Sequence, residues 1–186
     1  MSEDTNKQFV VEGRIVYCHL AAPDKFGKHS CQIVIDKKAK VVKELAAAIK
    51  ELIKTNLNGK KPAANKIPLG EAEEKFGEDF SDSVCLKCSS TEPVRMLSKS
   101  KQPLDSDREF PNGCDVKALV SLSAYSNEWG PGMTCFINGV QFISENDPIG
   151  RAKPSDETID GFFDAIEGDG GGEGSAEVDT ADFFKT

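Results

Sequence analysis

Hydrophobic and polar positions alternate along much of the chain with the two-residue period of β-strands. In residues 114–125, apolar side chains from Val116 to Leu122 fall on one face and mostly polar ones on the other, which predicts a half-buried strand. The turn SNEWGPG follows, and residues 133–144 are its expected antiparallel partner. Further strands are predicted at 9–20, 29–36, 84–90 and 94–97.

A helical period interrupts these strands once. Apolar residues recur at three- and four-residue steps from Val42 to Ile53, Asp36 is the expected N-cap, and the helix should run to about Leu57. Residues 59–83 show no sustained period and are expected to form a long loop with one short helical turn at most. Several strands with one main helix predict a small curled sheet or barrel.

The composition changes near residue 155. The chain has 186 residues and a net charge of -8, but residues 155–186 hold ten acids and one base, whereas the other 154 carry 22 bases and 21 acids. The acidic pI of 4.9 therefore describes the tail and not the body. A segment rich in Gly and acid cannot bury enough apolar surface to offset chain entropy. We expect a domain over 1–154 and a disordered acidic tail over 155–186.

Four phenylalanines lie in this tail, as the pairs Phe162-Phe163 and Phe183-Phe184. Paired aromatics among acids are typical of short docking motifs. The alternative is a tail that only keeps the protein soluble and carries these residues incidentally.

The chain has no sign of export or membrane insertion. No stretch approaches the roughly 18 uncharged apolar residues of a membrane span, and the N-terminal residues lack the basic-then-apolar pattern of a signal peptide. We expect an intracellular protein that binds no membrane. Its six cysteines are then expected to be reduced and mostly buried thiols.

The sequence offers little for catalysis. His19 and His29 are the only histidines, and no nucleophile, phosphate-loop or metalloprotease motif occurs. Three acids from Asp105 to Glu109 imitate a calcium loop, but Phe110 stands where such a loop requires Gly. We expect neither enzyme activity nor a cofactor.

Cys85 and Cys88 have the spacing of a zinc site or a redox pair. Because they are three residues apart in a predicted strand, they should face opposite sides, which opposes chelation. A metal-dependent enzyme stays an alternative that elemental analysis would test. The residues that would complete a site are Cys18, Cys31, His19 or His29.

Nucleic-acid binding has the most support from the residues themselves. A single strand is held by a basic groove and by aromatic faces on which bases stack, each stack contributing about 1 to 3 kcal/mol. Taken singly, each lysine is more typical of a solvated surface charge, and Trp129 is equally typical of a core anchor. The candidate DNA-binding residues are Arg14, Tyr17, Lys28, Lys87, Arg95, Lys99, Lys101, Lys117, Tyr125 and Trp129.

Several short motifs follow one another in a distinctive order along the second half of the chain. They are Pro93, the turn Asn112-Gly113-Cys114, and the segment Gly139-Val140-Gln141-Phe142 ahead of Asn146-Asp147-Pro148. With GRIVYCHLAAPD near the N-terminus, they make residues 9–152 resemble phage-type single-stranded-DNA-binding proteins with an OB-fold. The resemblance implies an all-β OB-like barrel with one main helix that coats single-stranded DNA, without strong sequence preference, during phage DNA replication, recombination and repair.

The same resemblance implies a tail that recruits replication proteins such as polymerase and helicase-primase. Asp179, Asp182, Phe183 and Phe184 fit such an ending, although two residues follow them. Since the tail resembles single-stranded DNA in charge, it should occupy the groove until DNA displaces it. The long helix departs from the standard OB order, because no third strand is found before it.

A body of nearly neutral charge also fits an OB-like protein-interaction module that binds no nucleic acid. The two hypotheses differ in salt dependence, because phosphate contacts release counterions. A phage-encoded protein of this kind is expected in the cytoplasm of the bacterial host. The sequence leaves open the oligomeric state, a homodimer included, as well as the site size, the choice between DNA and RNA, and the partner of the tail.

Overall fold

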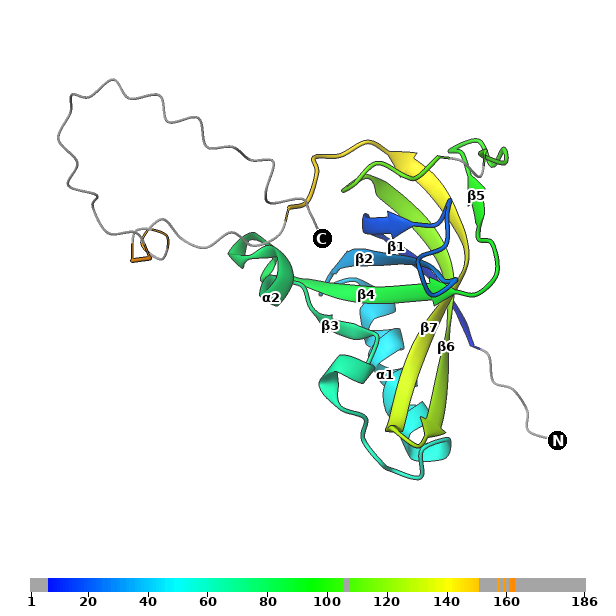
Figure 1. The fold of residues 1–186 in the computed structure, drawn as a ribbon, viewed down its shortest axis with the longest axis vertical. Coiled ribbons are helices and arrows are strands. Elements are labelled where there is room, and N and C mark those ends of the chain that lie inside the picture. The colour runs from blue at the N-terminus through cyan, green and yellow to red at the C-terminus, as the bar shows by residue number, and fades with distance from the viewer. Residues whose placement is uncertain (1–6, 106–107, 151–156, 158, 160, 163–186) are drawn as a thin grey trace, which may run out of the picture. The chain divides into compact units, whose positions relative to one another are not determined.

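The computed structural model describes residues 7–105, 108–150, 157, 159 and 161–162, in two units that span 1–153 and 154–186. The strands of the first unit are β1 (Gln8–His19), β2 (His29–Asp36), β3 (Leu69–Glu71), β4 (Ser83–Ser90), β5 (Arg95–Leu97), β6 (Asp115–Asn127) and β7 (Gly130–Ser144), as Figure 1 shows. Its helices are α1 (Lys40–Thr55), α2 (Glu73–Phe76) and two single 3-10 turns, Ala64–Lys66 and Glu78–Phe80. Within the described ranges, no helix is long and apolar enough to cross a membrane.

Five strands close into a barrel. β1 pairs with β2 and with β6, β2 pairs with β4, and β6 pairs with β7, all antiparallel. The ring closes where β4 meets β7 in parallel, with Ser89 opposite Phe136. The short strands β3 and β5 pair with the remaining edges of β4 and β7. This is an OB-type barrel, as expected, and its third barrel strand, β4, follows the helix α1 instead of preceding it.

Alternation along the strands fills the barrel interior. The four apolar residues of β6 that share a face, from Val116 to Leu122, are at most 3% exposed, as their pattern predicted. α1 adds Leu45 and Ile49 to the same core. Burying a side chain of this size contributes about 1.5 to 3 kcal/mol, so the barrel is held mainly by these contacts. The largest fully buried side chains are Ile15, Leu20, Ile33, Ile35, Leu45, Leu86 and Ile137.

The helix α1 begins later than its sequence pattern predicts. The Asp36 carboxylate accepts a hydrogen bond from the Lys38 backbone N–H at 2.7 Å, and its carbonyl accepts one from Ala39 at 3.0 Å. Asp36 therefore forms a local turn at the end of β2, and the N-cap position belongs to Ala39, which has no capping side chain. The prediction of Asp36 as N-cap was wrong, and the helix is shorter than the expected span to Leu57.

The segment 59–83 is more ordered than the loop that the sequence predicts. β3 pairs with β4 through Leu69 opposite Leu86. In α2, Phe76 is buried on the outer side of the barrel against Val16 and Val34, in a second apolar cluster. The segment therefore forms a flap over part of the outer face of β1, β2 and β4.

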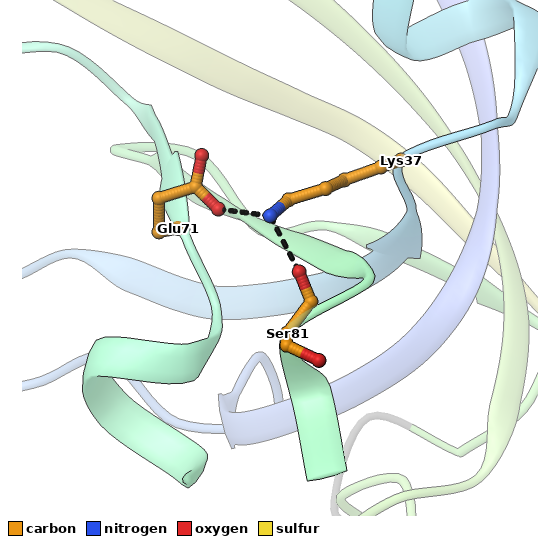
Figure 2. A network of polar contacts seen from close by, with 3 residues as sticks. All are labelled: Lys37, Glu71 and Ser81. Atoms are coloured by element: carbon orange, nitrogen blue, oxygen red, sulfur yellow. Dashed lines mark hydrogen bonds and ion pairs between the residues drawn. The ribbon is translucent and has the colours of Figure 1, made fainter. Parts of the chain in front are cut away.

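A polar contact fastens this flap to the barrel. Figure 2 shows Lys37, just after β2, with its ammonium between the carboxylate of Glu71 on β3 and the carbonyl of Ser81 before β4. The hydrogen bond to Glu71 raises the pKa of Lys37 above its ordinary value. Lys37 thus joins the middle of the flap, at β3, and its last residues to the end of β2.

All six cysteines are free, and each except Cys18 is buried. In the barrel core, the Sγ atoms of Cys88 and Cys135 lie 3.7 Å apart, whereas Cys85 packs in the outer cluster with Phe76. Cys85 and Cys88 therefore face opposite sides of β4, as their spacing predicted. Among the described residues, no three or more His, Cys, Asp or Glu side chains lie where they could hold a metal ion.

Candidate nucleic-acid interface

A groove of about 470 Å³ crosses β2 and β4 and continues beside the hairpin of β6 and β7. Two tyrosines, Tyr17 and Tyr125, and two lysines, Lys66 and Lys87, line it. In the part of the chain that the structure describes, neither Asp nor Glu contributes to this lining. Its remaining polar lining consists of His19, Ser30, Gln32, Asn65, Ser89 and Thr134.

Tyr17 reaches the groove because β1 carries a bulge. The register with β2 shifts between Val16 and His19, which places one extra residue in β1. Val16 packs in the outer cluster and Cys18 against the core, so the bulge leaves the intervening Tyr17 on the outer side. Tyr17 adopts φ of 48°, a left-handed conformation that is rare for a bulky residue.

One aromatic contact positions the ring of Tyr17. It is 42% exposed, and its centroid lies 6.1 Å from that of Phe76 in a stacked arrangement. The flap therefore supports one side of the ring, and the rest of the ring remains accessible from the groove.

The β6–β7 hairpin supplies the aromatic residue at the other end of the groove, Tyr125. Tyr125 is 40% exposed and lies opposite Gly132 across the hairpin. Trp129, in the turn, is 76% exposed, so it is not a core anchor, and it does not line the groove. The ammonium of Lys66 donates a hydrogen bond to the backbone carbonyl of Trp129 and so joins the flap to the end of the hairpin.

Lys87 lies in the middle of the groove. It is on the outer face of β4, opposite Gln32 of β2, and it also borders a neighbouring hollow of about 510 Å³ beside β3. Asn65 and Ile67 line both spaces as well, so the groove and the hollow meet along the flap. A cation at this position is accessible to a ligand that follows either path.

Arg95 and Lys117 lie together elsewhere. They border a separate hollow of about 460 Å³ over β5, β6 and β7, which shares no lining residue with the groove. Lys117 is also engaged in an ion pair with Glu12, with 2.7 Å between Nζ and Oε1. These two predicted residues are therefore not part of the groove.

Arg14 makes backbone contacts within the domain. Its Nε donates to the carbonyl of Gly113 at 3.1 Å, and its guanidinium also donates to the carbonyl of Asp147. It thus joins the turn before β6 to the segment after β7. The guanidinium of Arg14 is committed to this structural contact and does not line the groove.

The remaining predicted cations lie in loops. Lys28 is in the β1–β2 loop, and Lys99 and Lys101 are in the loop after β5, all of them exposed. Lys99 accepts a hydrogen bond at its carbonyl from Gln141, and Lys101 adopts a positive φ of 65°. None of the three lines the groove.

The tail residues singled out in the sequence, Asp179, Asp182, Phe183 and Phe184, lie outside the described residues, as does Phe163. In the second unit, the backbone N–H groups of Gly161 and Phe162 donate to the carbonyls of Glu157 and Ile159, each at 3.0 Å, and form a local turn. The side chain of Phe162 is 83% exposed there.

Sequence reasoning missed Lys66, which lines the groove, and Phe136, which does not line it but lies opposite the lining residue Ser89. Lys66 belongs to a segment expected to be a loop and enters the groove only because the flap folds back. Phe136 alternates with the buried Cys135 and Ile137, is 38% exposed, and lies beside Ser89 where the barrel closes. Its alternation was visible in the sequence, but its position next to β4 depends on closure of the ring.

Glu109 has a role that its calcium-like spacing did not indicate. Its carboxylate accepts hydrogen bonds from the backbone N–H groups of Leu20 and Ala21, each at 2.8 Å, and from the thiol of Cys18 at 3.1 Å. Burial opposes ionisation of Glu109, but these hydrogen bonds outweigh it and lower its pKa. Glu109 therefore fixes the start of the β1–β2 loop, at the end of the groove.

Comparison with known proteins identifies relatives of this barrel. The family model described as the single-stranded-DNA-binding protein of Enterobacter phage Enc34 matches residues 10–169. The solved structure of the single-stranded DNA-binding protein from bacteriophage Enc34 has a TM-score of 0.67 at 19% identity, and the match covers 84% of this chain and 90% of that chain. For the same protein in complex with single-stranded DNA the TM-score is 0.66 at 18% identity, with 77% and 89% covered.

A more distant structural neighbour comes from bacteriophage T7. It is gp2.5, a single-stranded DNA-binding protein, with a TM-score of 0.53 at 16% identity and coverage of 76% of this chain and 93% of that chain. No curated protein is significantly similar in sequence. At such low identities the solved structures establish the shared fold, whereas the family model matches most of the sequence. The chain belongs to the family of phage single-stranded-DNA-binding proteins represented by that of Enterobacter phage Enc34.

Proposed function

We propose that this chain binds single-stranded DNA in the groove across β2 and β4, without strong sequence preference and without catalysing a reaction. One observation carries the proposal: in a chain with 31 acids and 23 bases, the groove is lined by two tyrosines and two lysines and, among the described residues, by no acid. The same face of OB barrels is used to bind oligonucleotides.

The chemistry of the lining suits a single strand. The ammonium groups of Lys66 and Lys87 offer charge to phosphates, and Tyr17 and Tyr125 offer flat faces to bases. Stacking tolerates every base, because every base has a π-face. Duplex DNA keeps its bases paired and stacked within the helix, so it would not use these rings.

The biological role that we propose is coating of single strands during phage DNA replication, recombination and repair. The acidic C-terminal segment would recruit replication proteins such as a polymerase or a helicase-primase. Membership of the family supports the first part, and the charge and paired phenylalanines of residues 155–186 support the second.

Fluorescence anisotropy of a labelled oligo-dT of about thirty nucleotides tests the binding, with a duplex of the same length as the control. We expect tight binding to the single strand alone, with the logarithm of affinity falling by about 0.7 per phosphate contact for each log unit of salt. Equal binding to the duplex, or no binding at low salt, would contradict the proposal. The second result would favour a protein-interaction module.

Deletion of residues 155–186 tests the role of the tail separately. If the tail competes with DNA for the groove, the truncated protein should bind oligo-dT more tightly than the full chain at low salt, and the difference should shrink as salt screens the charges. Unchanged affinity would contradict the competition but leave DNA binding in place.

A further inference from the structure

The loop between β1 and β2 presents an aromatic ring to solvent. Phe26 is 74% exposed and is flanked by Lys25 and Lys28. The ammonium of Lys25 lies 5.0 Å from the centroid of the Phe26 ring. Neither Phe26 nor Lys25 belongs to the groove lining or to either apolar cluster.

Hydrogen bonds hold the loop in one conformation. The Asp24 carboxylate accepts from the backbone N–H groups of Phe26 at 2.8 Å and Lys28 at 3.0 Å. The backbone N–H of Asp24 also donates a hydrogen bond to the carbonyl of Lys28 at 2.8 Å. The backbone hydrogen bonds from Lys28 and Phe26 lower the pKa of Asp24, so its charge is used within the loop. Phe26 is therefore presented by an ordered turn, which reduces the entropy lost when a ligand binds.

The loop is continuous with the groove. His19 and Ser30 line the groove and are cross-strand partners at the base of the loop. The Glu109 carboxylate fastens the backbone N–H groups of Leu20 and Ala21 directly after His19. A strand that runs along the groove past His19 and Ser30 therefore arrives at this loop.

We propose that Phe26, with Lys25 and Lys28, forms a second contact site for the same single strand. One base stacks on the phenyl ring there, and the lysines contact the adjoining phosphates. An aromatic ring between two cations matches a nucleotide in both shape and charge. The inference rests on the proposed function and extends it: the bound strand continues beyond the groove, past His19 and Ser30, at the end away from Tyr125.

Two lengths of oligo-dT test this inference, one of about six nucleotides and one of about fifteen, within the range of site sizes for OB-folds. Phe26→Ala should lower the affinity for the longer oligonucleotide at least fivefold and change that for the shorter one less than twofold. Trp129 is the only tryptophan, and its carbonyl accepts a hydrogen bond from the groove residue Lys66. A change in its fluorescence therefore reports binding beside the hairpin end of the groove in each case.

Three variants serve as controls. Phe26→Leu keeps the apolar bulk without a flat face, so it should lower the affinity for the longer oligonucleotide as Phe26→Ala does. Phe26→Tyr keeps the flat face and should retain the affinity. Lys25→Gln should weaken binding of the longer oligonucleotide and lessen its salt dependence. Lys50→Gln should change neither the affinity nor its salt dependence. It removes an exposed charge of α1 that lines none of the described hollows.

Different failures have different meanings. If the unmodified protein binds neither oligonucleotide, the proposed function and this inference both fail. If it binds both but Phe26→Ala binds them equally well, only the inference fails. An equal loss for both lengths, or a changed self-association without a change in affinity, would also overturn it.

Discussion

The ring of Tyr125 lies directly over the backbone of Gly132, its partner across the β6–β7 hairpin. A Cβ atom on Gly132 would lie 2.7 Å from Cε2 of the ring and closer still to Cζ and the hydroxyl oxygen. The Tyr125 ring thus occupies the space that a side chain at Gly132 would fill. This arrangement keeps an amphipathic ring against the hairpin and accessible to the groove.

Gly132→Ala should therefore weaken binding of single-stranded DNA. The added methyl group displaces the Tyr125 ring, and loss of one stacking contact of about 1 to 3 kcal/mol corresponds to a decrease in affinity of at least about fivefold. Anisotropy measures the affinity, and thermal unfolding should show a small change because Tyr125 is partly exposed. Gly150→Ala is the matched control, since a Cβ there meets no atom within 4 Å. Equal affinity of the two variants would contradict the role of Tyr125.

Lys87→Gln should reduce both the affinity and its dependence on salt. Lys87 is exposed in the middle of the groove and forms none of the ion pairs found among the described residues, so its charge is available to a phosphate. Removal of one phosphate contact should lessen the slope of log affinity against log salt by about 0.7. Titrations at several salt concentrations measure this slope, with Lys50→Gln as the control. An unchanged slope would place Lys87 outside the DNA path.

Glu109→Gln should destabilise the protein at neutral pH and have less effect in acid. Hydrogen bonds lower the pKa of Glu109 in the folded state below its ordinary value of 4.5, so the charged form stabilises the fold. This contribution is fully present above the ordinary pKa and is lost as the pH falls through the lowered one. Thermal unfolding of both proteins from neutral to acidic pH should show their melting temperatures converging. A constant difference would contradict an electrostatic contribution.

Gly113→Ala should be far more destabilising than Gly27→Ala. Both glycines adopt a positive φ, of 85° and 73°, which costs an alanine about 1 to 2 kcal/mol. At Gly113 a Cβ would also overlap the carbonyl of Asp147, whereas at Gly27 it meets nothing within 4 Å. Denaturant unfolding should give a loss of roughly 3 kcal/mol or more for Gly113→Ala. Similar losses for both would show that the close approach to Asp147 contributes little.

The strands could be predicted because their alternation is local. β6 needs only its own residues to define an inner face, and Trp129 stands between turn residues that define the hairpin. β3 has three residues and exists by pairing with β4, so no period of its own could predict it. The Asp36 carboxylate bonds to Lys38 because β2 ends there, a boundary that the helical period does not contain.

The groove could be predicted only in part, for a related reason. The sequence placed Lys87 on a strand face and Tyr17 and Tyr125 at strand ends or turns, and the structure brings these three together in one groove. Lys66 enters the groove through the folding of the flap, and the contacts of Arg14 with Gly113 and Asp147 join segments distant in the sequence. Such contacts depend on tertiary structure and leave no periodic signal.

The pairing of β1 with β6 has a consequence for biosynthesis. β1 leaves the ribosome before the other strands of the barrel, yet its Val11 pairs with Ala118, and the ring closes only when Phe136 reaches Ser89. The apolar faces of the β1–β2 hairpin and of the helix α1 therefore stay exposed until nearly the whole domain has been synthesised. Folding that depends on contacts between such distant segments is slow, and exposed strand edges during this interval favour aggregation. A nascent chain interrupted before β7 should be a target for chaperones or proteases of the cell that makes it.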